Sequence, residues 1–484
     1  MGEKKIKRNP KAPRQEPPLV DAVVRTVSAC EVTQGFTEDQ VKIEALRCLH
    51  CVNAPCVDAC PLHLDIKSFI EKLAEEDFEG AFEKISEQSP FPGVCGRVCQ
   101  HELFCEKSCL LGKKLDPVAI GSLERFIADS HRQAVEKKLE TAPVPTGPKV
   151  ALIGSGPASL IAAYDLVRKG YRVTIFEALH KLGGVLAYGI PNFRLPREIL
   201  NEEIARLKTM GVEFETDFIV GRTATMEELF EEGFAAIFAG TGAGLPFMMG
   251  VPGENLVGVY TANEFLTRIN LMQAWDTAHS DTPVLVGKRT IVIGGGNSAM
   301  DAARWAKRMG SETIVLFRRG RAEMRARLEE IDHAEQEGVK FEFLAAPVRV
   351  IGDENGCVTG LECIRMELGA LDSSGRPAPV PIEGSEHIVP VDTVVAAIGQ
   401  GPNPTLQRAT PELLTKRGKI VVDDHGETSI PHVYAGGDVV RGGSTVILAM
   451  KDGRAAAEAI HKALGYQAGD PPLEPDSEQT TVDA

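Results

Sequence analysis

The chain has 484 residues, enough for about three domains, and its balance of apolar and charged residues is that of a globular protein. A formal net charge of -15 argues against nucleic acid as a main partner, because phosphate binding draws on Lys and Arg. There is no run of about 18 apolar residues, so the sequence predicts no membrane span. The basic, Pro-rich start has no apolar core, unlike a secretory signal, and we expect a cytoplasmic protein.

The first segments in chain order are an arm and a Cys-rich region. Residues 1–20 are expected to form a loose arm. Residues 21–140 mix short helical patterns with the Cys clusters; in 64–73, for example, apolar residues recur every three or four positions. Nine of the eleven Cys lie between Cys30 and Cys109. In a reducing cytosol such a group is more often a metal site than a set of disulfides.

Two groups of four Cys have spacings that suit iron–sulfur clusters. The first follows C-x2-C-x4-C-x3-C-P and the second C-x3-C-x5-C-x3-C. A Cys before Pro often reaches a second cluster in two-cluster ferredoxins, so eight thiolates predict two 4Fe-4S clusters. The alternatives are zinc sites and buried free thiols, but zinc favours x2 pairs, of which one is present. The eight are Cys48, Cys51, Cys56, Cys60, Cys95, Cys99, Cys105 and Cys109.

The three remaining Cys have no such spacing. Cys30 stands alone, and Cys357 and Cys363 flank an expected turn much later in the chain. Free Cys usually behaves as a small buried apolar residue. We therefore expect all three to be packing residues.

A dinucleotide-binding pattern begins after a Pro/Gly-rich linker at 141–148. A strand at 149–153 leads into the turn GSGPAS and a helix, and a second strand at 171–176 ends at an acid. The glycines allow the turn and the approach of a pyrophosphate, the helix N-terminus supplies N–H donors, and the acid accepts from a ribose. Ser159 takes a place where Gly or Ala is usual. The candidate residues are Gly154, Ser155, Gly156, Pro157, Ala158 and Glu177.

The same pattern recurs later in the chain with a basic ending. A strand at 289–293, the turn GGGNSA, a helix and a strand at 313–317 repeat the unit, but two Arg replace the acid. Guanidinium groups bind phosphate oxygens, so this unit should prefer NADPH over NADH; a solvated basic loop is the alternative. The candidate residues are Gly294, Gly296, Asn297, Ser298, Arg318, Arg319 and Arg325.

The last part of the chain adds a third α/β segment and a tail. A strand is expected at 393–398, and the stretch YAGGD occupies 434–438. Residues from about 466 onward are acidic and polar, a composition typical of disordered segments.

Several motifs together resemble the small (β) subunit of NADPH-dependent glutamate synthase. Besides the Cys groups and both glycine turns, they are LGGVLAYGIPNFRLP, AGTGA, FRRGRAEM and YAGGDVVRGGSTVILAMKDGRAAA. The resemblance implies an α/β fold with two Rossmann-like, glutathione-reductase-like domains behind an α-helical 4Fe-4S module. On this pattern the module is 21–140, the FAD-binding domain 148–285 plus 385–465, the NADPH-binding domain 286–384, and the tail 466–484.

The resemblance also assigns cofactors to residues. It implies FAD in the first unit, NADPH in the second and two 4Fe-4S clusters in front. Five further positions would lie along the FAD: Gly184, Gly242, Gly437, Asp438 and Val446.

For the clusters, the chain is similar to the N-terminal part of dihydropyrimidine dehydrogenase. One ligand set would be Cys48, Cys51, Cys56 and Cys109, and the other Cys60, Cys99, Cys105 and Glu124. The relative has Gln where this chain has Glu124. Cys95 would then be a spare thiol, although its spacing alone makes it a ligand candidate.

The function implied is hydride transfer from NADPH to FAD, followed by passage of single electrons through the clusters to a partner. In glutamate synthase that partner makes glutamate from glutamine and 2-oxoglutarate; it would be the large subunit or another redox subunit. The chain also resembles the large subunit of a bifurcating NADH-dependent reduced ferredoxin:NADP oxidoreductase and of sulfide dehydrogenase. A non-catalytic electron-transfer scaffold is the alternative from another class. No catalytic side chain is expected, because the cofactors carry the chemistry.

Overall fold

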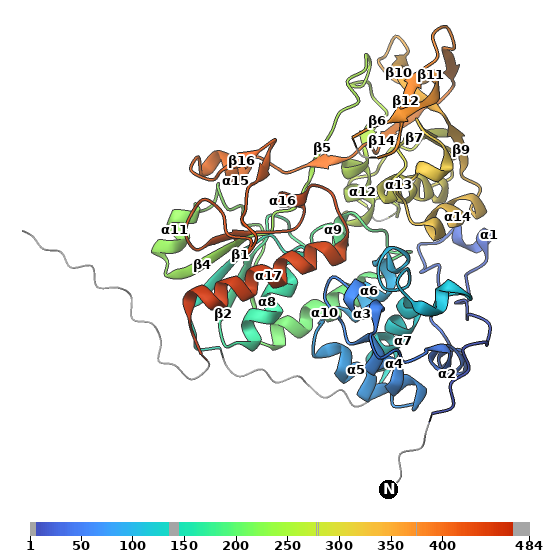
Figure 1. Ribbon diagram of the computed structural model, residues 1–484. Coiled ribbons are helices and arrows are strands. Elements are labelled where there is room, and N and C mark those ends of the chain that lie inside the picture. Colours follow the sequence, from blue (N-terminus) through green and yellow to red (C-terminus); the bar gives the residue numbers. More distant parts are fainter. Residues whose placement is uncertain (1–5, 135–144, 277, 279, 374, 468–484) are drawn as a thin grey trace, which may run out of the picture.

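The computed structural model describes residues 6–134, 145–276, 278, 280–373 and 375–467. Figure 1 shows a blue helical module at lower right, one α/β unit at left and a second at upper right. The expected α/β class is confirmed. The expected disordered tail lies, from residue 468 on, outside the described residues. None of the described helices is long and apolar enough to cross a membrane.

The N-terminal module consists of short helices and two 3-10 turns. The expected helical stretch at 64–73 is confirmed by a helix at Ile66–Ala74. Its buried residues are Ile66, Phe69, Ile70 and Leu73. Its elements are α1 (Ala22–Arg25), α2 (Glu38–Arg47), α3 (Pro55–Ala59), α4 (Ile66–Ala74), α5 (Phe78–Ser86), α6 (Pro92–Val98), η1 (His101–Leu103), η2 (Leu110–Lys113) and α7 (Ile120–Gln133).

The described part of the N-terminal arm is not loose, which corrects the expectation from its composition. The backbone N–H of Asn9 donates to the carbonyl of Leu46 at 2.8 Å. The guanidinium of Arg14 lies 2.8 Å from a carboxylate oxygen of Glu106, and Arg47 donates to the carbonyl of Ala12. These long-range contacts fasten the arm along the module, and composition alone gives no sign of them.

The first α/β unit has a five-stranded parallel sheet in the order β18-β4-β1-β2-β3. Its strands are β1 (Lys149–Ile153), β2 (Arg172–Phe176), β3 (Glu213–Glu215), β4 (Phe234–Ala239) and β18 (Val433–Ala435). The carboxyl ends of β1, β2, β4 and β18 align at one edge of the sheet. The helices and small strands of this unit are α8 (Pro157–Arg168), α9 (Val185–Tyr188), α10 (Arg197–Thr209), α11 (Met226–Glu231), α15 (Thr405–Ala409), β16 (Thr415–Lys416), β17 (Lys419–Ile420), α16 (Asp438–Arg441) and α17 (Val446–Leu464).

The second α/β unit has a parallel sheet in the order β6-β14-β7-β8-β9. Its strands are β6 (Val259–Thr261), β7 (Arg289–Ile293), β8 (Glu312–Phe317), β9 (Lys340–Phe343) and β14 (Thr393–Ala396). An antiparallel layer covers it, formed by β10 (Ala345–Gly352), β11 (Val358–Leu371), β12 (Pro377–Pro381) and β13 (His387–Val389). Its helices are α12 (Ala262–Asn270), α13 (Asn297–Arg308), η3 (Arg321–Glu323) and α14 (Leu328–Gln336).

This sheet extends beyond the expected limits of the NADPH-binding domain, 286–384. Both β6 and β14 pair within it, although the sequence placed them in the other domain. The chain crosses between the two units at β5 (Leu245–Pro246) and β15 (Gln400–Gly401), which pair antiparallel. Strand pattern alone does not reveal which of two parallel sheets a strand joins.

The core explains how the parts are held together. The buried apolar residues of the helical module and of the first unit's α8 and α17 form one continuous cluster. Phe193 of the first unit and Val32 of the N-terminal segment pack into the core of the second unit. The three parts therefore form one molecule with shared cores.

Candidate functional site

The first glycine turn crosses the aligned strand ends of the first sheet. Gly154 has a positive φ of 90°, and a Cβ there would lie 2.7 Å from the carbonyl oxygen of Gly240. Gly156 caps α8 with no side-chain cap, so the first N–H groups of this helix are left for another acceptor. Around Gly156 a Cβ would meet only one atom within 4 Å, and even that at 4.0 Å. The turn thus has an open side at a helix N-terminus, as a pyrophosphate requires.

Glu177 binds this turn directly. The N–H and hydroxyl of Ser155 both donate to Oε2 of Glu177, and the N–H of Leu179 donates to Oε1 at 2.9 Å. The N–H of Gly183 donates in turn to the Ser155 hydroxyl at 2.9 Å. A carboxylate accepts about four hydrogen bonds, so Glu177 keeps capacity for a ribose hydroxyl while it orders the turn.

The other positions assigned to FAD gather around the same turn. A Cβ on Gly184 would lie 3.0 Å from Cα of Gly156, so the two backbones touch there. A Cβ on Gly242 would have no heavy atom within 4 Å. Beside it, the hydroxyl of Thr241 is buried and has no hydrogen-bond partner among the described residues. An open cradle and an orphaned hydroxyl fit a large polar cofactor such as FAD.

Asp438 and Tyr188 close this region from two sides. Asp438 accepts from the N–H of Ser444 at 3.0 Å and from its hydroxyl at 2.8 Å. Burial raises the pKa of Asp438, although the Ser444 hydrogen bonds act against it. Burial, and then the charges of Asp438 and Glu177, raise the pKa of Tyr188 to about 12. Tyr188 is therefore near both carboxylates, and sequence reasoning missed it although it lies in the quoted LGGVLAYGIPNFRLP stretch.

Helix α17 begins at Val446 and backs the cradle. Thr445 caps it by accepting from the N–H of Leu448. A Cβ on Gly453 would lie 1.9 Å from the carbonyl oxygen of Ala158, so α17 crosses α8 with backbones in contact. On the other side of α8, a Cβ on Gly240 would meet the Ser159 hydroxyl at 2.3 Å. The small side chain of Ser159, at a place where Gly or Ala is usual, thus still permits close packing of α8 against Gly240.

The second glycine turn repeats this geometry. A Cβ on Gly294 would lie 2.3 Å from the carbonyl oxygen of Ala397, whereas a Cβ on Gly296 would meet nothing within 4 Å. Gly296 caps α13 without a side-chain cap, and Ser298 is exposed in its first turn. The side chain of Asn297 accepts from the N–H of Arg327 at 3.0 Å, so it also fastens the loop between η3 and α14.

The predicted phosphate-binding arginines separate into two roles. Arg318 and Arg325 are exposed, and neither side chain has a hydrogen bond or ion pair with another described residue. Arg319 is buried, and its guanidinium binds Asp372 at 2.6 Å and the carbonyl of Pro377 at 2.8 Å. The structure therefore gives Arg319 a structural role. Alternate side chains of the chain leaving β8 point to opposite sides, which the RR motif alone did not resolve.

The first cysteine set lies together, as the resemblance implied. Cys48, Cys51, Cys56 and Cys109 line one small apolar cavity. Burial raises the pKa of Cys56 to about 12, and the charges of Cys48 and Cys109 act in the same direction. Four thiols around an apolar cavity are a donor set that fits a 4Fe-4S cluster. Spacing alone did not show that Cys109 joins the first group.

The second set is deeper in the module and includes Glu124. After burial, the charges of Glu124 and Cys60 raise the pKa of Cys99, and Cys99, Cys60 and Glu124 all act on Cys105. Glu124 is 3% exposed; one carboxylate oxygen lies 3.3 Å from Nε2 of His101, and the other has no hydrogen-bond partner among the described residues. An orphaned, buried carboxylate oxygen beside three thiols fits a metal ligand. Among the described residues, no three His, Cys, Asp or Glu are grouped as around a single ion.

Cys95 is buried on α6 and faces the first α/β unit. Its Sγ lies 3.7 Å from Sδ of Met450 on α17. Glu203 of α10 fastens the same helix by accepting from the N–H of Gly93 at 2.6 Å and of Val94 at 3.3 Å. Burial raises the pKa of Glu203 to about 8, since these hydrogen bonds only partly offset desolvation. Helix α6, which ends at Cys99 of the second set, is thus seated directly against the first unit.

The other three Cys differ in their surroundings. Cys363 is buried in β11, as expected, but it lies inside the strand and not beside a turn. Cys30 and Cys357 are exposed, which corrects their assignment as packing residues. Cys30 follows α1, and its Sγ lies 2.9 Å from the hydroxyl of Ser28.

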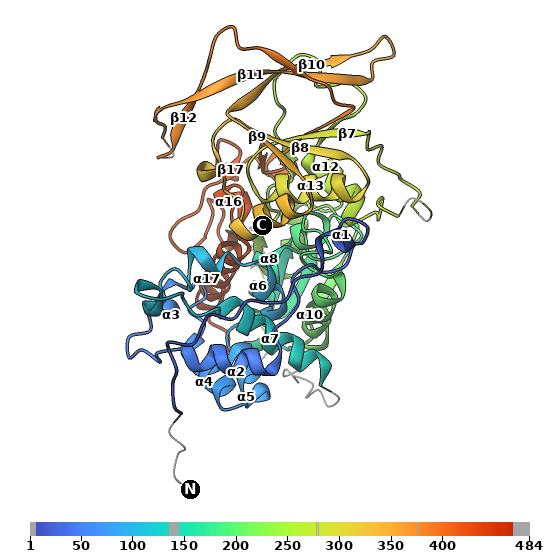
Figure 2. The same cartoon turned by 90° about the vertical axis from the view of Figure 1, so that its right-hand side faces the viewer.

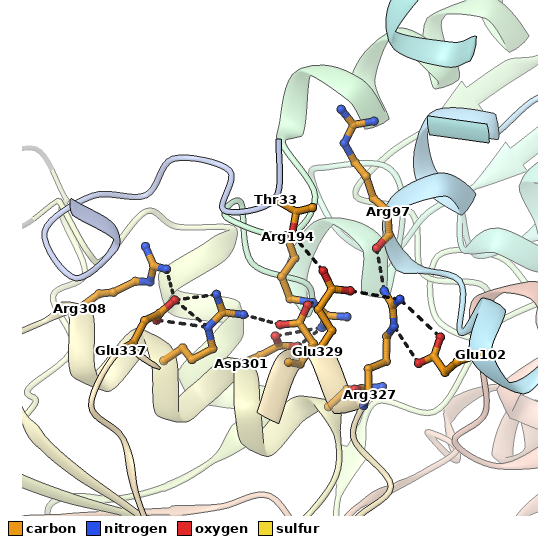
Figure 3. Close-up of polar contacts among 12 residues, drawn as sticks. Thr33, Arg97, Glu102, Arg194, Asp301, Arg308, Arg327, Glu329 and Glu337 are labelled. Carbon is orange, nitrogen blue, oxygen red and sulfur yellow. Dashed lines mark hydrogen bonds and ion pairs between the residues drawn. The ribbon is translucent and has the colours of Figure 1, made fainter. Parts of the chain in front are cut away.

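Ion pairs hold the second unit against the rest of the molecule, as Figure 3 shows. Arg194 of the first unit binds Asp301 at 2.8 Å and Glu330 at 3.0 Å in the second. Arg327 of the second unit binds Glu102 of the helical module at 3.1 Å and the carbonyl of Arg97. Such buried pairs specify one arrangement more than they add stability. The contacts of Arg327 fix the start of α14 beside the second cysteine set.

Comparison with known families agrees with this geometry. A family model described as pyridine nucleotide-disulphide oxidoreductase matches residues 148–453. A second, described as dihydropyrimidine dehydrogenase domain II, 4Fe-4S cluster, matches residues 25–136. The first implies FAD and NADP, and the second implies 4Fe-4S binding in the helical module.

Two curated relatives and two solved structures are similar to the chain. The glutamate synthase (NADPH) small chain of Escherichia coli K12 is 36% identical, over 92% of this chain and 96% of that protein. The NADP(+)-dependent formate dehydrogenase subunit beta of Moorella thermoacetica is 40% identical over 87% of this chain, which spans 62% of that protein's length. Mycobacterium tuberculosis FprA in complex with NADPH has a TM-score of 0.55 at 22% identity, covering 66% of this chain and 85% of that chain. Thioredoxin reductase of T. acidophilum has a TM-score of 0.50 at 20% identity, covering 66% and 100%.

Proposed function

Because the chain belongs to the family of the NADPH-dependent glutamate synthase small chains, we propose that it is the electron-input subunit of such an enzyme. It would oxidise NADPH and deliver the electrons to a partner that makes glutamate from glutamine and 2-oxoglutarate. The observation that carries this proposal is the extent of the match, which covers 96% of the Escherichia coli small chain. The chain is an NADPH-dependent oxidoreductase whichever partner it serves.

The residues described above would hold the cofactors in fixed places. FAD accepts a hydride and releases single electrons, and 4Fe-4S clusters carry one electron at a time, so these groups supply the redox chemistry. The N-terminus of α8 and the carboxylates Glu177 and Asp438 would orient the flavin nucleotide. Gly296, Ser298 and Arg318 would bind the phosphates of NADPH.

Two clusters are proposed, one on each cysteine set. Cys60, Cys99, Cys105 and Glu124 would form the inner site, beside the first α/β unit. Cys48, Cys51, Cys56 and Cys109 would form the outer site.

The outer set defines the face where a partner would approach. All four of its Cys are half-buried, whereas Cys60, Cys99 and Cys105 are buried. Val52 beside it is 94% exposed, and Leu49 and Leu110 at the cavity rim are exposed too. Exposed apolar side chains grouped in this way are typical of protein interfaces. We therefore place the partner subunit on the loop that follows Cys48.

A second candidate function is electron input into a different redox complex. The NADP(+)-dependent formate dehydrogenase subunit beta is 40% identical, a higher identity than that of the glutamate synthase small chain. The NADPH-Fe(3+) oxidoreductase subunit beta of Geobacter sulfurreducens is 38% identical, and the chain spans 64% of its length. The same module could therefore feed other acceptors.

Identification of the partner tests the glutamate proposal. The full chain, tagged and purified anaerobically from its native cells, should bring down a large chain. That complex should form glutamate from glutamine and 2-oxoglutarate when NADPH is added. Co-purification with a formate dehydrogenase chain, together with NADP-dependent formate oxidation and no glutamate formation, would assign the second function instead.

A further inference from the structure

The β11–β12 hairpin brings an additional arginine to the basic edge of the second unit. Figure 2 shows this hairpin reaching out from the top of the molecule. Its strands pair antiparallel, with Leu371 opposite Pro377, and Arg376 immediately precedes the returning strand β12. Arg376 is half-buried and lies far in sequence from the RR motif at the end of β8.

Arg319 fixes the hairpin to the end of β8. Its guanidinium binds Asp372 on one side of the hairpin turn and the carbonyl of Pro377 on the other. The N–H of Arg376 donates to the carboxylate of Asp372 at 3.4 Å. Because Arg319 is only 2% exposed, this anchor is protected from solvent. The position of Arg376 relative to β8 is therefore set by the contacts of Arg319 with Asp372 before it and Pro377 after it.

Arg376 also contacts the loop that carries Arg325. Its Nη1 donates to the carbonyl of Glu323, the last residue of η3, at 3.4 Å. Two residues later, the N–H of Arg325 donates at 2.8 Å to the carbonyl of Gly295 in the second glycine turn. Arg376 thus lies on the same edge as Arg318 and Arg325, next to the turn where the pyrophosphate is expected.

Positive charge accumulates at this edge. Desolvation, and then the charges of Arg325, Arg319 and Arg318, lower the pKa of Arg376, and Asp372 offsets this only in part. The carboxylate of Glu323 is used locally, since it accepts from the N–H of Gly320 at 3.0 Å. Gathering like charges costs free energy unless an anion is bound among them. A phosphate dianion would relieve that cost.

We propose that Arg376 is a specificity-determining residue that binds the 2′-phosphate of NADPH together with Arg318 and Arg325. The hairpin then forms one wall of the nucleotide site, and Arg319 is the positioning residue that holds this wall. This inference rests on the proposed use of the second unit for NADPH. It adds a ligand that the Gly-rich turn and the RR motif do not contain.

Binding of two nucleotide fragments to the full-length protein tests the inference. Isothermal calorimetry with 2′,5′-ADP and with 5′-ADP compares ligands with and without the 2′-phosphate. Arg376→Ala should weaken binding of 2′,5′-ADP by about tenfold or more, as expected for loss of a charge-assisted hydrogen bond, and leave 5′-ADP unchanged. Arg376→Lys should retain part of the affinity. Steady-state assays should show the same selectivity, with the KM for NADPH raised and that for NADH unchanged.

Two matched variants make the outcomes distinguishable. Arg365→Ala removes an exposed arginine from the same hairpin, in β11, and should change neither affinity. Arg318→Ala should weaken 2′,5′-ADP selectively, like Arg376→Ala. If Arg376→Ala binds 2′,5′-ADP as tightly as Arg365→Ala does, while Arg318→Ala binds it more weakly, the inference about Arg376 is wrong and the NADPH site stands. If Arg318→Ala also binds 2′,5′-ADP normally, the placement of NADPH itself fails. Equal weakening of both fragments by Arg376→Ala would show a structural role and overturn the inference.

Discussion

Replacing Gly453 by Val is expected to give a chain that loses its flavin site and is destabilised by about 3 kcal/mol or more. Even a Cβ at this position would lie 1.9 Å from the backbone oxygen of Ala158. Because that neighbour is backbone within α8, it cannot move aside as a flexible side chain can. Helices α17 and α8 would have to separate. Because Gly156 caps α8 only two residues before Ala158, the glycine turn would be displaced as well. Urea unfolding and FAD content of the purified protein measure both effects.

The matched control is Ala455→Val on the same helix. Ala455 is exposed on α17, so Val there costs only its lower helix propensity, about 0.5 kcal/mol or slightly more. Its flavin content should equal that of the unchanged protein. Equal stability of the Gly453 and Ala455 variants would contradict the backbone contact between the two helices.

The second large effect is expected at the outer cysteine set. Cys109→Ala should lower the iron content from about eight to about four per chain, because one 4Fe-4S cluster loses a corner ligand. The inner cluster and the flavin should remain, so NADPH should still bleach the flavin absorbance. Iron analysis and low-temperature electron paramagnetic resonance of the reduced protein measure the loss.

Cys95→Ala separates ligands from spare thiols in the same experiment. The thiol of Cys95 faces Met450, and Glu124 offers an unpartnered oxygen for the inner site. Cys95→Ala should therefore retain about eight irons. Loss of about four irons from this variant would show that Cys95, and not Glu124, is the fourth ligand of the inner site. Full iron in Cys109→Ala would contradict the outer ligand set.

The local α/β pattern was predictable because it depends on short segments. Each glycine turn is preceded by a buried strand and followed by a helix, at Lys149–Ile153 and again at Arg289–Ile293. The positive φ at Gly154 and the open side at Gly156 are the physical reasons for the sequence pattern. The helix at 64–73 followed from its apolar spacing in the same way.

Features that depend on tertiary contacts were not predictable. The arm at residues 6–20 is held by partners more than 25 residues away, such as Glu106 for Arg14, and a composition rich in Pro does not reveal them. The strand Thr393–Ala396 joins the second sheet because it pairs with β7, a choice that its own residues do not encode. The contacts of Arg319 with Asp372 and Pro377 were hidden for the same reason, because both partners lie more than 50 residues further along the chain.

The site residues show the same division. The members of each cysteine group follow from spacing, but the joining of Cys109 to Cys48, Cys51 and Cys56 depends on how the chain returns past the cavity. Tyr188 lies in a quoted motif, but only its closeness to Glu177 and Asp438 in the fold places it beside the first glycine turn.

Anaerobic titration of the purified full chain with NADPH tests the central claim most directly. The account predicts about one FAD and about eight irons per chain, and bleaching of the flavin absorbance by NADPH before any partner is added. NADH at the same concentration should act more weakly. A protein that holds zinc in place of iron, or whose bound flavin NADPH does not bleach, would contradict the claim that this chain is an NADPH-dependent iron–sulfur flavoprotein.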